Sequence, residues 1–349
     1  MSQRLTIALD AMGGDHAPEM VVAGADLARE RFPDVQYVLY GDSARIEPLL
    51  AKHPTLKGVA RVVHTAEAVA GDAKPAVALR SGRQSSMRLA IDAVAAGEAA
   101  AVVSAGNTGA LMAMAKFVLK TLPGIDRPAI ASFFPTQRGE SVMLDLGANT
   151  ECTADNLVQF ALMGTVFART VLGLTEPTVG LLNIGSEEVK GNETVRAAAA
   201  RLKEAPIPGR FYGFVEGTDI AAGTTDVIVT DGFTGNVALK TAEGTAKLYA
   251  EFLRRTFQSS LMAKLGYLLA RSAFTKLKQR ADPRRYNGAM FLGLRGVCVK
   301  SHGGTDAIGF ANAIGVAVNL AMNGFNEKIK AEMHRLGGDT LPDTKAAAV

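Results

Sequence analysis

The chain has 349 residues, of which 48% are hydrophobic and 21% are charged, and its formal net charge is +4. This composition is typical of a globular protein and excludes a disordered or coiled-coil chain. The length fits one large α/β domain or two closely associated ones. The two cysteines, Cys152 and Cys298, form no C-x-x-C pair, so neither a disulfide framework nor a zinc site is indicated and a reducing cytoplasm is expected.

Short apolar runs alternate with helix-like segments from the amino end onward. The N-terminal MSQRLTIALD has too few apolar residues for a signal-peptide core and is predicted to be the first strand. The same order recurs in VQYVLYGD before a helix over 43–52, in AAVVSAG before NTGALMAMAKFVLK, in SVMLDLGA before a helix over 155–172, and in TVGLLNIG before a helix over 193–203. Continuous apolar strands separated by helices predict a mostly parallel sheet covered on both faces, which is a three-layer α/β sandwich.

The longest uncharged run, over 307–325, raises the question of a membrane span. It contains Asn312, Asn319 and Asn323 together with several glycines, so we expect a buried helix instead. No repeat, linker or compositional boundary divides the chain. A single domain over 1–335 is therefore predicted, followed by a flexible C-terminal tail over 336–349.

Five turns share one composition: DAMGGDH, SAGNTGA, DLGANTE, LNIGSEEVKGNE and TDGFTGNVALK each follow an apolar run and combine glycine with Ser, Thr, Asn or Asp. Glycine lets backbone N–H groups approach a ligand, and a helix N-terminus adds partial positive charge, so such turns suit phosphate. A single turn of this kind is ordinary in an α/β protein, but five together favour an anion site. Lys190 and Lys240, close behind two of the turns, would add full positive charges.

The motifs that are missing narrow the chemistry. There is no G-x-G-x-x-G, P-loop, G-x-S-x-G or H-E-x-x-H motif, which argues against dinucleotide, ATPase, simple hydrolase and zinc-protease functions. The histidines are scattered without metal spacing, so no metal is predicted. His16 and His302 lie in glycine-rich turns, where a histidine can donate to an anion or transfer a proton, and the other three are expected to be structural.

A basic amphipathic segment, expected to protrude as a helical hairpin over about 247–285, contains many cations. Within 254–285 these cations are opposed only by Asp282. Leucines 261, 265, 268 and 269 are spaced for one helical face, with a break expected near Gly266. Such a segment suits an anionic membrane surface or an acidic protein partner, and packing on the fold or into a dimer is the alternative. No nucleic acid is expected, because no binding module is recognisable.

The ordered motifs DAMGGDHAP, SAGNTGA, RPAIA, LDLGAN, LNIGSEEVKGNE, TDGFTGNVALK, YNGAMFLGLRG and KSHGGTD resemble the bacterial phosphate acyltransferases of phospholipid synthesis, the PlsX type. The resemblance runs over about 6–327. It implies reversible transfer of a fatty acyl group from acyl carrier protein to inorganic phosphate, without cofactor or metal. It also implies a fold similar to phosphate acetyltransferases and the isocitrate dehydrogenase group. The implied protein is a cytoplasmic homodimer, peripherally associated with the inner face of the membrane, that passes acyl phosphate to a membrane-embedded glycerol-3-phosphate acyltransferase.

For this reaction we expect phosphate to attack the thioester directly, so that catalysis comes from positioning and from hydrogen bonds to the developing oxyanion. The residues expected to bind phosphate are Gly13, Gly14, Ser104, Asn107, Thr108 and Lys240. The residues expected to take part in catalysis are His16, Lys190, Asn236 and His302, with either histidine protonating the departing thiolate or steadying the carbonyl oxygen. The residues expected to orient them are Asp10, Asp15, Asn149 and Asp231, since carboxylates beside phosphate would repel it. Contacts to the carrier protein or the membrane are expected from Arg254, Arg255, Leu261, Lys264, Leu265, Leu268, Arg271 and Lys278.

Two other functions stay open on the sequence alone. A nicotinamide-dependent oxidoreductase of the isocitrate dehydrogenase-like fold would need an adenosine pocket and usually a carboxylate cluster for a metal, and the sequence indicates neither. A non-catalytic membrane-surface scaffold built around the basic segment would leave the five glycine turns unexplained.

Overall fold

One sheet of eleven strands runs through the molecule. The computed structural model describes residues 4–280 and 282–337. The strands are β1 (Thr6–Asp10), β2 (Gln36–Gly41), β3 (Ala60–His64), β4 (Ala101–Ser104), β5 (Ala129–Thr136), β6 (Gly139–Leu144), β7 (Thr178–Leu182), β8 (Arg210–Val215), β9 (Val227–Val229), β10 (Ala289–Leu292) and β11 (Val297–Lys300). Their spatial order is β3-β2-β1-β4-β11-β10-β5-β6-β9-β7-β8.

Most neighbouring strands of this sheet are parallel, as predicted. The exceptions lie at its centre, where β10 runs antiparallel to β11 and to β5, and β5 runs antiparallel to β6. This antiparallel centre was not predicted from the apolar runs of the sequence. It separates two parallel groups, β3-β2-β1-β4-β11 and β6-β9-β7-β8, which form the two halves of the molecule.

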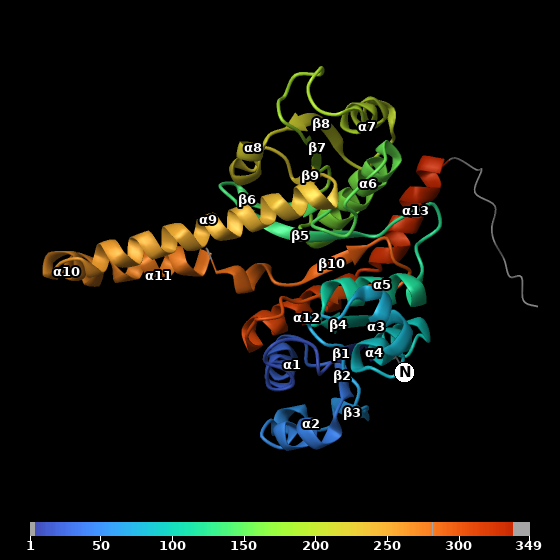
Figure 1. Ribbon diagram of the computed structural model, residues 1–349, viewed down its shortest axis with the longest axis vertical. Coiled ribbons are helices and arrows are strands. Elements are labelled where there is room, and N and C mark those ends of the chain that lie inside the picture. The colour runs from blue at the N-terminus through green and yellow to red at the C-terminus, as the bar shows by residue number, and fades with distance from the viewer. Residues whose placement is uncertain (1–3, 281, 338–349) are drawn as a thin grey trace, which may run out of the picture.

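Helices cover both faces of the sheet, which confirms the three-layer sandwich. The α-helices are α1 (Glu19–Arg31), α2 (Ser43–Leu50), α3 (Pro75–Ser81), α4 (Ser86–Ala95), α5 (Thr108–Leu119), α6 (Ala154–Val171), α7 (Glu193–Glu204), α8 (Gly217–Ala222), α9 (Gly232–Gln258), α10 (Leu261–Leu269), α11 (Arg271–Arg280), α12 (Ala307–Met322) and α13 (Phe325–Gly337), with 3-10 turns η1 (Pro54–Leu56) and η2 (Pro283–Tyr286). Alternate residues of β1 enter different cores: Ile7 and Leu9 belong to the core that also contains residues of α1, α6 and α12, and Ala8 belongs to the core that contains residues of α4 and α5. Figure 1 shows α1 and α12 on one side of β1 and β4, with α4 and α5 on the other.

The long apolar run forms α12, which is a core helix as predicted. Phe310, Ile314 and Val318 have no exposed surface. Among the described residues, no single helix is long and apolar enough to cross a membrane, and α12 with α13 passes that test only as a pair bent by 54°. The tail predicted over 336–349 lies outside the described residues from residue 338 onward.

The basic segment forms an arm that extends from the body, with α9 running outward, α10 at the tip and α11 alongside α9 (Figure 1). An aromatic cluster joins the three helices, because the ring of Phe257 lies 5.6 Å from that of Tyr267 and 4.8 Å from that of Phe274. The predicted break near Gly266 is wrong, since Gly266 lies inside α10. The helix restarts instead at Ser260, whose side chain accepts a hydrogen bond from the backbone N–H of Ala263.

Candidate functional site

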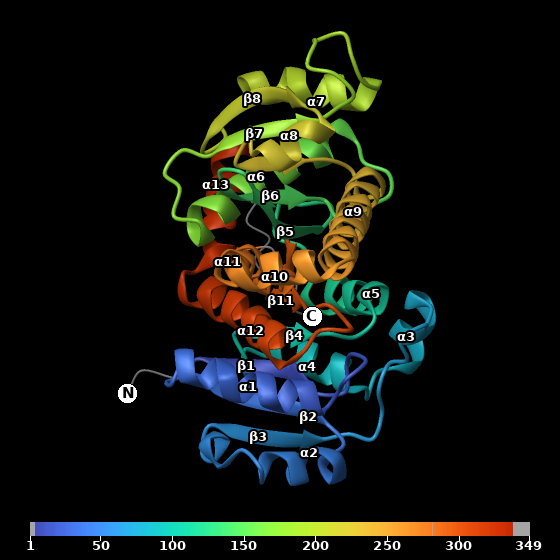
Figure 2. The same cartoon turned by 90° about the vertical axis from the view of Figure 1, so that its left-hand side faces the viewer.

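The predicted turns fall into two groups, one on each half of the sheet. The turns after β1 and β4 lie beside the KSHGGTD turn after β11, because these three strands are neighbours. We call them the first turn group. The turns after β6, β9 and β7 lie on the other half and form the second turn group. Figure 2 shows α5, which follows β4, and α9, which follows β9, on the same side of the molecule.

Asp10 is the buried centre of the first turn group. Its carboxylate accepts a hydrogen bond from the Ser86 hydroxyl and another from the Ser104 hydroxyl, each at 2.6 Å. Burial raises the pKa of Asp10, and these hydrogen bonds oppose that change. Ser86 was not among the predicted residues. Asp10 therefore fixes the turn, which agrees with an orienting role.

Ser104 and Gly13 also shape this turn. Ser104 is fully buried, and its hydroxyl donates to Asp10 while accepting from the backbone N–H of Gly106 at 3.0 Å. The hydroxyl hydrogen is therefore directed at Asp10, and the phosphate-binding role of Ser104 stays a prediction. A Cβ on Gly13 would lie 2.4 Å from Asp10 Oδ2, so the turn accepts only glycine there. Gly14 has a φ of 108°, a conformation that also favours glycine.

The side chain of Asn107 is likewise occupied, as the N-cap of α5. Its Oδ1 accepts from the backbone N–H of Ala110 at 2.8 Å, and its Nδ2 donates to the carbonyls of Gly71 and Ala73. Asn107 therefore holds the helix start and the segment before α3, and its phosphate-binding role stays a prediction. The first turn of α5 remains open to an anion, because it begins with the exposed Thr108 and carries the partial positive charge of the helix N-terminus.

Backbone bonds join the three turns of the first group. The N–H of Ser301 donates to the Ser104 carbonyl at 2.9 Å, and the N–H of Asp15 donates to the Gly303 carbonyl at 2.9 Å. Asp15 is exposed, and an added Cβ on Gly304 would lie 3.2 Å from its Oδ2, so its carboxylate lies against the β11 turn.

His302 and His16 are both exposed beside these turns. The N–H of Gly304 donates to His302 Nδ1 at 3.2 Å, so the neutral ring holds its proton on Nε2. That proton is available to a ligand, and the N–H of His302 is fixed by Asn287 Oδ1 at 2.9 Å. His16 has no comparable anchor among the described side-chain contacts. The geometry therefore favours His302 over His16 as a proton donor.

Lys300, the last residue of β11, is a half-buried cation that the sequence analysis missed. Its Nζ donates to the Ala105 carbonyl at 3.5 Å and to the carbonyl of Ser301. Burial lowers the pKa of Lys300 to about 8, the nearby carboxylates of Asp10 and Asp15 oppose this change, and the charge of Lys240 adds to it. The available signal was a lysine ending an apolar strand directly before a glycine turn.

The second turn group is built around Asp145, which is fully buried and was also not predicted. Its carboxylate accepts from the backbone N–H groups of Ile130, Ala148 and Asn149 at 2.9, 3.0 and 2.7 Å. Burial raises its pKa, and these hydrogen bonds oppose the rise. Asn149 Nδ2 donates to Asp145 Oδ2 and to the Pro128 carbonyl, so Asn149 supports this turn rather than facing a ligand.

Two further residues of this group lie at the start of α9. Asp231 caps the helix by accepting from the N–H and the hydroxyl of Thr234, each at 2.8 Å. Asn236 is exposed and lies over Gly147, where an added Cβ would be 3.6 Å from that of Asn236. Burial raises the pKa of the nearby Cys152 thiol to about 11, so this thiol is not a ready nucleophile at neutral pH.

The two predicted lysines differ in position. Lys240 on α9 is exposed and pairs with Glu243 at 2.9 Å. Its positive charge also contributes to lowering the pKa of Lys300. It therefore links the second turn group to the first. Lys190 lies in the loop between β7 and α7, where its N–H donates to the Glu187 carbonyl. Both elements lie at one end of the long axis of the molecule (Figures 1 and 2). The structure does not bring Lys190 to the first turn group.

The arm exposes most of the side chains predicted to make external contacts. Leu261, Leu265 and Leu268 are 84, 49 and 61% exposed, and no residue of α10 is buried. Lys264 and Arg271 are exposed as well, whereas the side chain of Lys278 lies outside the described part of the structure.

The arm is less positively charged than residues 254–285 alone indicate. Glu251, just before those residues, pairs with Arg254 at 2.8 Å and with Arg255 at 2.7 Å. These bonds lower the pKa of Glu251 to about 2, so it stays ionised. Among the described residues, Lys264 and Arg271 form no ion pair, so cations without a carboxylate partner occur at the tip of the arm.

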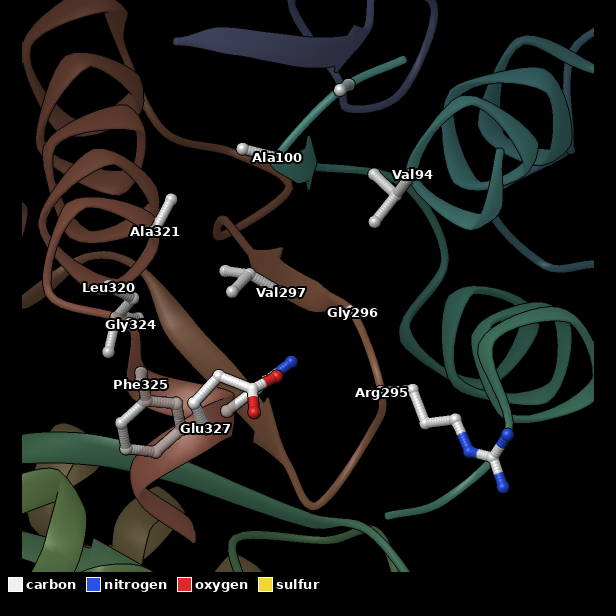
Figure 3. Close-up of a pocket in the computed structure, with 12 residues that line it drawn as sticks. Val94, Ala100, Arg295, Gly296, Val297, Leu320, Ala321, Gly324, Phe325 and Glu327 are labelled. Atoms are coloured by element: carbon white, nitrogen blue, oxygen red, sulfur yellow. The ribbon is translucent and has the colours of Figure 1, made fainter. Parts of the chain in front are cut away.

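A separate pocket of about 210 Å³ lies at the opposite ends of β4 and β11 from the first turn group (Figure 3). Its walls combine apolar side chains, such as Val94, Val297 and Phe325, with the polar Asn326 and Glu327, so the lining is mixed. The side chain of Arg295 extends away from them and donates to the Thr121 carbonyl at 3.0 Å. No group of three or more metal-ligating side chains occurs within residues 4–280 and 282–337.

Solved structures share this architecture. A phosphotransacetylase from Streptococcus pyogenes aligns with a TM-score of 0.61 at 17% identity, over 92% of this chain and 95% of its own. A putative 4-hydroxythreonine-4-phosphate dehydrogenase from Salmonella typhimurium aligns with a TM-score of 0.54 at 14% identity, over 91% of this chain and 100% of its own. The fold thus defines a class of mixed α/β proteins whose solved members carry transacetylase and dehydrogenase titles.

Sequence comparison is more specific than the fold. The family model described as "Fatty acid synthesis protein" matches residues 5–328. A protein from Rhodospirillum centenum named "Phosphate acyltransferase" is 77% identical over 336 residues, covering 96% of this chain and 95% of the relative. The chain belongs to this fatty acid synthesis protein family, the PlsX-type phosphate acyltransferases.

Proposed function

We propose that this protein transfers a fatty acyl group from the thioester of acyl carrier protein to inorganic phosphate, forming acyl phosphate for glycerophospholipid synthesis. The observation that carries the proposal is 77% identity across 96% of the chain to a relative named phosphate acyltransferase. The fold alone would not distinguish acyl transfer from oxidoreduction, because a putative dehydrogenase shares it. The oxidoreductase alternative is not favoured, since the family and its named relatives point to acyl transfer.

The reaction requires no nucleophile from the protein. An oxygen of hydrogen phosphate attacks the thioester carbonyl carbon, a C–O bond forms and the C–S bond breaks. The proton that hydrogen phosphate loses is the proton that the departing thiolate gains, so acyl phosphate and free thiol are the products. Positioning by the first turn group, with His302 Nε2–H donating to the carbonyl oxygen or the sulfur, supplies the catalysis.

The arm is the proposed contact surface for acyl carrier protein and for the inner face of the membrane. The exposed leucines of α10 suit an apolar environment, and Lys264 and Arg271 suit an acidic carrier or anionic lipid. The exposed Tyr249 and Phe252 on α9 support the homodimer. In this proposal the protein is cytoplasmic and peripherally bound, and it passes acyl phosphate to a membrane-embedded glycerol-3-phosphate acyltransferase.

The test of the reaction is release of free carrier protein from acyl-acyl carrier protein. We expect release that requires phosphate and is not supported by sulfate. Absence of release, together with reduction of a nicotinamide cofactor by a hydroxy acid, would overturn the proposal in favour of the dehydrogenase alternative.

A second experiment addresses the arm. Leu268→Glu is expected to abolish flotation with anionic liposomes, and Arg271→Glu is expected to weaken affinity for acyl carrier protein, because each change opposes one contact. Lys57→Glu, an exposed residue on the opposite half of the fold, is the matched control. Unchanged flotation and carrier affinity in both arm variants would remove the arm from the proposal.

A further inference from the structure

Lys300 is placed among the first turn group by its strand. In the parallel pairing of β11 with β4 it stands opposite Ser104, so its side chain starts beside the turn that opens α5. The turn after β1 lies on the other side of β4. Lys300 is half-buried, so its ammonium is partly shielded from water and still reachable.

The ammonium of Lys300 is not engaged by a carboxylate. Its hydrogen bonds go to the main-chain carbonyls of Ala105 and Ser301, and no ion pair of Lys300 occurs within 4.0 Å among the described residues. Asp10, the carboxylate with the largest effect on the pKa of Lys300, already accepts two hydroxyl hydrogen bonds at 2.6 Å. A lysine that served only to neutralise Asp10 would be expected to contact it directly.

The charges around Lys300 come from several elements. Asp10 on β1, Asp15 in the turn after it and Cys298 on β11 raise its pKa, and Lys240 on α9 lowers it. Burial outweighs the three favourable groups and leaves the pKa at about 8. The ammonium is therefore short of negative charge in the free protein. A bound dianion would supply that charge.

We propose that Lys300 is the cation that binds the inorganic phosphate in the first turn group, with Lys240 contributing charge from the second. This inference rests on the proposed function, since phosphate is its substrate. The first turn of α5 follows β4, the strand beside β11, so its N–H groups lie at the same end of the sheet as Lys300 and one phosphate would meet both a full charge and backbone donors. Lys190, which was predicted to add charge to the same anion, lies in the loop after β7 in the second turn group.

The first test measures phosphate binding without turnover, by titration calorimetry and by thermal stabilisation in phosphate. Lys300→Gln is expected to weaken phosphate binding about 10- to 100-fold, the value of one charge-assisted hydrogen bond, and to abolish the stabilisation. Lys57→Gln removes an exposed lysine that precedes β3, at the opposite end of the parallel strands from the first turn group. This variant is expected to bind phosphate like the unaltered protein. A folded Lys300→Gln protein with unchanged phosphate affinity would overturn the proposal.

The second test uses pH and does not depend on Lys300→Gln folding. In the unaltered protein the KM for phosphate is expected to rise above pH 8, approaching tenfold per pH unit, as the ammonium loses its proton. Lys300→Arg keeps its charge at every pH, so its phosphate KM is expected to stay flat between pH 8 and 9.5. A rise of equal size in Lys300→Arg would assign the titration to another group and overturn the proposal.

Failure of this inference is distinguishable from failure of the proposed function. If the unaltered protein binds phosphate and Lys300→Gln does not, the inference stands even where carrier release is absent. If carrier release requires phosphate but neither variant changes phosphate affinity or its pH dependence, the function stands and Lys300 is only a structural counter-charge.

Discussion

The half-buried ammonium of Lys300 should make the free energy of unfolding depend on pH in a way that one substitution removes. The ordinary pKa of a lysine is 10.5, and in the folded protein that of Lys300 is about 8. Between these values the unfolded chain binds the proton and the folded protein does not, so stability rises with pH across this window. The slope is at most about 1.4 kcal/mol per pH unit, and the full difference is roughly 3 kcal/mol.

Lys300→Met is the perturbation of choice, because methionine keeps an unbranched chain of similar length without the charge. Urea unfolding in phosphate-free buffer at pH 7.5, 8.5 and 9.5 gives the free energy of unfolding of both proteins. The unaltered protein is expected to gain about 1–2 kcal/mol relative to the variant over this range. Phosphate should flatten its profile, since the anion binds the protonated form. Parallel profiles of the two proteins without phosphate would refute the reasoning.

Three further predictions follow from single contacts. Ser104→Ala removes the 2.6 Å hydrogen bond to the buried Asp10 carboxylate and should lower the free energy of unfolding by about 1.5–3 kcal/mol; a loss below about 0.5 kcal/mol in urea unfolding would contradict it. Gly235→Ala would place a Cβ 1.9 Å from the Asp145 carbonyl oxygen, so α9 must shift; a loss of at least about 1–3 kcal/mol is expected, and an unchanged melting temperature would argue against it. His302→Gln should lower kcat about 100-fold or more with a smaller change in the KM for phosphate, and full turnover in a folded variant would exclude its proton-donor role.

The sequence was sufficient for β1, β2, β4, β6 and β7, because these strands are continuous apolar runs followed by helices, whereas the edge strands β3 and β8 were not predicted. The same rule failed at the centre of the sheet, where β10 and β5 are antiparallel. A strand's direction depends on its neighbours, and β10 finds its partner β5 more than 150 residues earlier in the chain. Local patterns carry no information about that pairing.

The candidate site shows the same limit at the level of side chains. The turns around Ser104 and Asn107 were found because their residue types suit an anion, but those types also suit turn and helix caps, which is how both side chains are used. Lys300 was missed because its proximity to Asp10 arises only when β11 is inserted beside β4. A lysine such as Lys300 can be identified as a site residue only when the order of the strands is known, and that order depends on segments far apart in the sequence.

The length of α9 determines how far the tip of the arm lies from the body of the protein. The helix begins beside the second turn group and continues for 27 residues to the tip of the arm, a length of about 40 Å at 1.5 Å per residue. With the leucines of α10 resting on a bilayer, the phosphate site would therefore stand well clear of the lipid surface. A small domain has a diameter of about 30 Å, so an acyl carrier protein would fit in the space under the arm. The length of one helix would thus allow the protein to stay on the membrane while its acyl donor enters and leaves from the water side.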